Sequence, residues 1–246
     1  MKLTILISGH IRTWERMADA FKEFVDVDYD LFLNVYDKKF GYTPYNQQIQ
    51  KFYDDDVLID SQILEMFEGI NLVDYRIDNN NIVDEQIEIE KQNVKLQFDT
   101  ARHGPDIFYS CYAQYRKLKL GFDMIERYEH DHGIKYDRVF KTRTEVAYKN
   151  GPLSNILSNF TDLPNKYAII DSRSSFPNDV LYIADRQSAQ DISTFMYDEF
   201  FEPRYSNPPT WPPHSMLKCA TEHHNINLLT HDIMDYIERE KIQQRF

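Results

Sequence analysis

Apolar residues along the chain follow two kinds of spacing. The mostly apolar run at residues 3–7 ends at Ser8-Gly9, which predicts a buried strand followed by a turn. Within residues 13–25 the apolar positions recur every three or four residues, as in an amphipathic helix. Residues 29–36 and 70–77 are rich in β-branched and aromatic side chains and predict two more strands. This strand–helix–strand order favours an α/β domain with a largely parallel sheet.

The second half of the chain continues the mixture of helical and strand patterns. Residues 107–132 have the longest helical spacing, and Gly133 is a typical stop signal. Residues 136–148 alternate, which predicts one strand with Lys141, Arg143 and Glu145 on a single face. Shorter elements follow, with strands expected at 167–170 and 180–183 and helices at 184–201, 214–224 and 233–242.

Residues 78–106 are polar and contain few bulky apolar side chains. Such a stretch is typical of a solvated surface insertion, and the alternative is a mobile lid. The chain shows no internal repeat and no hinge, so we expect residues 1–246 to form a single domain.

Composition removes several classes of function. The formal charge is 28 − 40 = −12, which argues against wrapping nucleic acid or binding a membrane through a polybasic surface. The 7 glycines are scattered, so neither a Walker A loop nor a Rossmann fingerprint can be written, and we expect no NAD or FAD. The usual GxSxG hydrolase motif is also absent.

Cysteine usage and hydropathy bear on compartment and cofactors. The 2 cysteines form no CxxC pair, which fits a reducing compartment and predicts neither structural zinc nor haem attachment. No apolar stretch approaches the roughly 20 residues of a membrane span. The first apolar run is too short for a signal peptide, so we expect a cytoplasmic protein. The oligomeric state stays open.

The first candidate cluster for chemistry is Ser8-Gly9-His10-Ile11-Arg12-Thr13, where the first strand meets the first helix. Free backbone N–H groups at a helix start favour an anion, and ligands bind at the carboxyl ends of strands in open α/β sheets. Arg12 could add a bidentate phosphate contact, and Ser8 or Thr13 a hydroxyl. The alternative is an ordinary turn with a capping hydroxyl.

Two further clusters contain charged residues near strands. Lys141, Arg143 and Glu145 on one face of a central strand suit a diphosphate, directly or through a divalent metal. The alternative is an edge strand with a solvated face. Asp171 and Asp179 lie beside predicted strands, where a carboxylate can act as a general base, although Asp is also common in turns. The histidines show no recognised metal-binding spacing.

Five motifs in order resemble those of bacterial and viral glycosyltransferases of surface-polysaccharide synthesis, which have a GT-A-like fold. They are Ser-Gly-x-x-Arg-Thr at 8–13, the strand at 30–37, the aromatic helix at 108–112, Tyr-Asp-x-Val-x-x-x-Arg-x-Glu at 136–145 and Asn-Asp-hydrophobe at 178–183. The resemblance spans residues 2–229, with the polar stretch before Asp106 unmatched. The chain departs from the pattern at Glu145, usually Asp, and at His214, where Glu often follows the proline.

The resemblance implies transfer of a sugar from a nucleotide-sugar donor to an acceptor hydroxyl of a glycan or polysaccharide. It assigns Asp179 as the base, with Asp171 as the alternative, and Glu145 as a ligand of Mn²⁺ or Mg²⁺. Eight residues are assigned to the nucleotide: Ser8, Gly9, His10, Arg12, Thr13, Asp37, Lys141 and Arg143. Two alternatives stay open. One is a catalytically silent nucleotide- or sugar-binding protein, and the other is a nucleotidyltransferase, which usually has a glycine-rich first loop.

Overall fold

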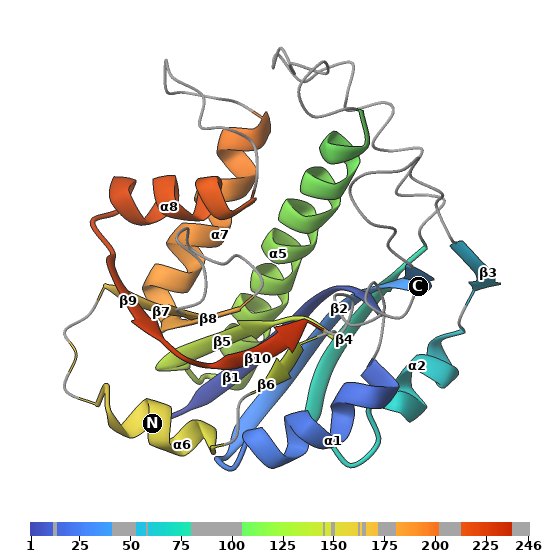
Figure 1. Cartoon of the computed structure of the whole chain (residues 1–246), viewed down its shortest axis with the longest axis horizontal. Helices are drawn as coiled ribbons and strands as arrows, with labels where there is room; N and C mark the ends of the chain where they lie inside the picture. Colours follow the sequence, from blue (N-terminus) through green and yellow to red (C-terminus); the bar gives the residue numbers. More distant parts are fainter. Residues whose placement is uncertain are drawn as a thin grey trace.

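The computed structural model describes residues 1–11, 14–40, 53–57, 59–79, 105–144, 146–148, 151–161, 163, 166–171, 181–201 and 213–237 (Figure 1). Their elements are β1 (Leu3–Ile11), α1 (Trp14–Phe24), β2 (Tyr29–Phe40), β3 (Tyr53–Val57), α2 (Asp60–Met66), β4 (Leu72–Asp78), α5 (Pro105–His132), β5 (Arg138–Thr142), β6 (Val146–Tyr148), α6 (Leu153–Ser158), β7 (Tyr167–Asp171), β8 (Tyr182–Asp185), α7 (Arg186–Phe201), α8 (Pro213–His223), β9 (Asn227–His231) and β10 (Met234–Ile237).

The central feature is an open mixed sheet with the strand order β3-β2-β1-β5-β8-β7-β9, in which β4 also pairs with β2. The strands β4, β2, β1 and β5 are parallel to one another. β8 runs antiparallel between β5 and β7, and β9 is parallel to β7. A second, small sheet pairs β10 with β6. The described residues therefore form the α/β domain that the strand–helix–strand pattern predicts.

Helices cover both faces of this sheet because its strands bury alternate side chains on opposite sides. Ile5 and Ile7 of β1 pack in one core cluster with residues of α1, α2 and α6. Leu6, which lies between them, packs in a second cluster with residues of α5, α7 and α8. Figure 1 shows α5, α7 and α8 together, away from α1, α2 and α6. We refer to the two sides as the α1 face and the α5 face.

One of the expected helices is wrong, and several elements were not predicted. The helix expected at 233–242 is instead the strand β10 in its described part, and β9 precedes it. Ile233, Met234 and Ile237 fit either period, and pairing of β10 with β6, far away in sequence, decides between them. β3 and α2 were also not predicted. Most of the expected polar insertion, residues 80–104, lies outside the described residues.

Candidate functional site at the carboxyl edge of the sheet

The strand directions gather the sequence-predicted clusters at one edge of the sheet. The parallel strands β1, β2, β4 and β5 all end there. Because β8 is antiparallel, it begins at the same edge, with Tyr182 opposite Lys141, and β7 ends there at Asp171. From β1 the chain passes through α1 to β2 on one side, whereas β5 lies on the other side. This reversal of strand order is a topological switch point, where ligands of open α/β sheets bind.

The end of β1 provides a backbone that a ligand can approach closely. β1 continues to Ile11 rather than turning at Ser8-Gly9, and its register with β2 shifts between His10 and Ile11. Gly9 has a φ of +124°, a conformation that favours glycine, and a Cβ placed there would meet no atom within 4 Å. Ser8 beside it is buried. Arg12 and Thr13 lie outside the described residues.

Asp37 lies at the same edge, near the end of β2, with a buried side chain. Residues 37 and 38 form a β-bulge between the pairs His10–Tyr36 and Ile11–Lys39, so the alternation along β2 does not fix the face of Asp37. Ser8 follows Ile7 of the α1 face, and its side chain is therefore directed toward the α5 face. The structure thus brings Ser8 and Asp37 to one edge of the sheet.

The charged cluster after β5 differs from the expected geometry. β5 ends at Thr142 and β6 begins at Val146, so the single strand expected at 136–148 is wrong and Arg143 follows the end of β5. The hydroxyl groups of Thr142 and Tyr148 are hydrogen-bonded at 2.8 Å, which joins the end of β5 to β6. Lys141 is 1% exposed and Arg143 is half-buried. Glu145 lies outside the described residues.

The side chain of Asp171, the last residue of β7, makes hydrogen bonds to the chain after β9. Its side chain is 0% exposed. One carboxylate oxygen, Oδ1, accepts hydrogen bonds from the backbone N–H groups of Ile233, at 3.0 Å, and Met234, at 2.8 Å. Asp171 therefore holds the turn between β9 and β10. This burial favours Asp179 over Asp171 as the base, and Asp179 lies outside the described residues.

Sequence reasoning missed a network of charges around the buried Lys117, near β2 and the end of β4. The Asp78 carboxylate pairs with Arg76, Arg116 and Lys117 at N···O distances of 2.8, 2.8 and 3.1 Å. Burial alone would raise the pKa of the Asp78 carboxyl, but the three cations outweigh it and hold that pKa below its usual value. The polar Asn34 within the apolar strand at 31–35 was the available sequence signal, because a buried amide needs partners.

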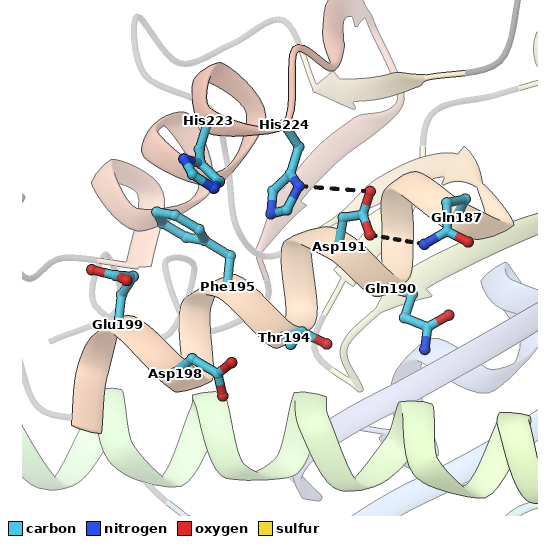
Figure 2. A pocket seen from close by; sticks show the side chains of 9 residues that line it. All are labelled: Gln187, Gln190, Asp191, Thr194, Phe195, Asp198, Glu199, His223 and His224. Atoms are coloured by element: carbon cyan, nitrogen blue, oxygen red, sulfur yellow. Dashed lines mark hydrogen bonds and ion pairs between the residues drawn. The ribbon is translucent and has the colours of Figure 1, made fainter. Parts of the chain in front are cut away.

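A separate hollow of about 350 Å³ lies between α7 and the end of α8 (Figure 2). Its walls are mostly polar and include Asp191, Asp198 and Glu199. Gln187 donates a 2.8 Å hydrogen bond to Asp191, and His224 lies 3.8 Å from the same carboxylate. The hollow contains none of the sequence-predicted site residues. Among the described residues, no group of three or more His, Cys, Asp or Glu side chains could hold a metal ion.

Comparisons with solved structures give weak likenesses, two of which are described here. No family model and no curated protein matches the chain. A protein from Desulfovibrio desulfuricans G20 assigned as a nucleotide-diphospho-sugar transferase matches with a TM-score of 0.43 and 10% identity, over 94% of this chain and 80% of that one. Mouse xyloside xylosyltransferase 1 matches with a TM-score of 0.42 and 9% identity, over 94% and 85%. Matches this distant carry no weight for activity. No helix in the described part of the chain is long and apolar enough to cross a membrane.

Proposed function

We propose that this chain is a glycosyltransferase that moves a sugar from a nucleotide-sugar donor to an acceptor hydroxyl. The observation that carries the proposal is the convergence at one switch point of the end of β1, the end of β5 and the start of β8. The first two carry Gly9 and the Lys141–Arg143 segment, which suit a diphosphate. The third begins at Tyr182, three residues after Asp179 in the chain, which suits an acceptor-side base.

Each group at this edge has a chemical role in the proposed transfer. Backbone N–H groups at residues 8–13, with Arg12, bind the anionic donor, and Asp37 contacts the ribose or the base. Asp179 accepts the proton of the acceptor hydroxyl as that oxygen attacks the anomeric carbon. The bond from the sugar to the diphosphate then breaks, and the half-buried Arg143 neutralises the charge of the leaving diphosphate, while the buried Lys141 adds positive charge from within the sheet.

The proposed metal is Mn²⁺ or Mg²⁺, and Glu145 is the residue that would hold it. A single carboxylate fits an ion that takes most of its other ligands from water and from the substrate's phosphates. Bound there, the ion would add positive charge beside the diphosphate. Lys141 and Arg143 already supply part of that charge, so we expect the metal to stimulate transfer without being strictly required.

Nucleotide binding is the first test. UDP and GDP, with and without Mn²⁺, should raise the unfolding midpoint, because a ligand of the folded state stabilises it by RT ln(1 + [L]/Kd). Arg12→Ala should weaken nucleotide binding by about 1–3 kcal/mol, the range of a charge-assisted hydrogen bond. Arg127→Ala is the matched control, since Arg127 is exposed and pairs with Asp74. Unchanged affinity in Arg12→Ala would remove Arg12 from the site.

A turnover assay distinguishes the proposed transferase from the alternatives. A transferase releases a nucleoside diphosphate from the donor, a nucleotidyltransferase releases pyrophosphate, and a silent binding protein releases neither. Asp179→Asn should keep nucleotide affinity and lose about 10²- to 10⁴-fold in rate, the usual contribution of a general base. Full turnover in this variant would place the base elsewhere.

A further inference from the structure

Lys117 of α5 is fully buried, although its side chain ends in a charged ammonium group. Its Nζ donates to the Val35 carbonyl at 2.6 Å and to Asn34 Oδ1 at 3.0 Å, and it lies 3.1 Å from Asp78 Oδ2. An ammonium has three N–H bonds, so each of them has an acceptor here. The Asn34 amide donates in return to the Lys117 carbonyl at 2.7 Å. One side chain thus fastens the ends of β2 and β4 to α5.

The β2 residues that Lys117 contacts are those that pair with the first sequence cluster. In the β1–β2 register, Asn34 lies opposite Ser8, Val35 opposite Gly9 and Tyr36 opposite His10. The Lys117 ammonium also lies 4.1 Å from the centroid of the Tyr36 ring, and the Tyr36 hydroxyl donates to the carbonyl of Ala113 on α5. The place of the last regular residues of β1 therefore depends on a segment of β2 that Lys117 holds.

The surroundings of Lys117 lower the pKa of its ammonium group. Burial lowers the pKa of the ammonium to about 7, the Asp78 carboxylate opposes this shift, and Arg116 and Arg76 add to it. An apolar side chain at a buried ionic position is often as stabilising as the ion pair or more so. Stability alone therefore does not account for a lysine at this position, whereas a directional clamp on three acceptors does.

We propose that Lys117 is a positioning residue, which holds the end of β2 and thereby fixes residues 8–10 of β1 at the carboxyl edge. Its importance for nucleotide binding rests on the proposed function. The positioning itself does not, because the contacts are present in the protein without a ligand.

Hydrogen exchange on the unliganded full chain tests the clamp directly. In Lys117→Met, the amides of residues 8–11 and 34–36 should exchange about tenfold faster or more, while those of β7 and β9 keep their rates, because the clamp is local. Lys119→Met is the matched control, two residues along α5, where the side chain is partly exposed and pairs with Asp123. Unchanged exchange at residues 8–11 would overturn the proposal. So would equal acceleration throughout the sheet, which a merely structural role predicts.

Asp78→Asn is a second variant, which tests whether Lys117 positions residues 8–10 even if Lys117→Met does not fold. It keeps the side-chain shape but removes the charge that helps Lys117 stay protonated, so the same segments should exchange faster. Nucleotide affinity in the parent should change around pH 7, and in Asp78→Asn this change should move to lower pH. Unaltered local exchange or an unmoved pH profile in Asp78→Asn refutes the clamp. If the parent binds no nucleotide, the proposed function fails, and exchange still decides the positioning.

Discussion

Replacing Asp171 separates a structural role from a catalytic one. Its carboxylate is fully buried, and one oxygen accepts two backbone hydrogen bonds from Ile233 and Met234. Asp171→Ala removes the oxygen that accepts both bonds and leaves two buried N–H groups unsatisfied, each of which costs about 1–3 kcal/mol of stability. Allowing for partial relaxation, we expect the free energy of unfolding to fall by about 2–5 kcal/mol.

Asp171→Asn gives a graded comparison at the same site. Both backbone bonds end on the same oxygen, so a carboxamide can place its carbonyl oxygen there and keep both acceptors. Charge-assisted hydrogen bonds are roughly twice as strong as neutral ones, so the loss should be smaller, about 1–2 kcal/mol. If Asp171 were instead the general base, Asp171→Asn would remove turnover and leave stability nearly unchanged.

Urea unfolding followed by circular dichroism measures these differences. For a chain of 246 residues, a loss of about 3 kcal/mol corresponds to roughly 6–12 °C in Tm. Asp19→Ala on α1 is the control, because Asp19 is exposed and should change stability by less than about 0.5 kcal/mol. A loss below about 0.5 kcal/mol in Asp171→Ala, or an equal loss in both Asp171 variants, would refute this reasoning.

Three other predictions concern packing, pH and metal binding. In Gly121→Ala the new Cβ would lie 2.6 Å from a methyl group of the fully buried Leu6. The free energy of unfolding should therefore fall by about 1–3 kcal/mol, although alanine has the better helix propensity. A variant that is more stable than the parent in urea would contradict this packing argument. Burial lowers the pKa of His224, so as the pH falls the unfolded chain takes up a proton at this histidine before the folded chain does. The free energy of unfolding should therefore fall as the pH drops below about 6.5. His224→Gln should lessen this fall, and an identical pH profile of stability in the variant would exclude this role of His224. In calorimetry, Mn²⁺ should bind appreciably only in the presence of UDP or GDP, and Glu145→Gln should weaken this Mn²⁺ binding. Tight binding of Mn²⁺ to the protein without a nucleotide would exclude the proposed site.

Local patterns predicted the elements whose apolar residues follow a regular spacing or a continuous run. The helical spacing at 107–132 corresponds to α5, and the apolar run at 3–7 lies within β1. Burial on a fixed face is a property of residues close together in the chain, so period and composition are sufficient to predict it.

Contacts between distant segments determined the rest. The pairing of β10 with β6 made a strand from residues expected to form a helix, and the Thr142–Tyr148 bond joins two strands where one was expected. Asp171 became an anchor because the β9–β10 turn brings two N–H groups to it, and Lys117 became a clamp because α5 crosses the ends of β2 and β4. A buried polar group takes its role from the partners that the fold brings within hydrogen-bond distance. For Asp171, Asn34 and Val35 these partners lie from 62 to 83 residues away along the chain, so no local pattern predicts them.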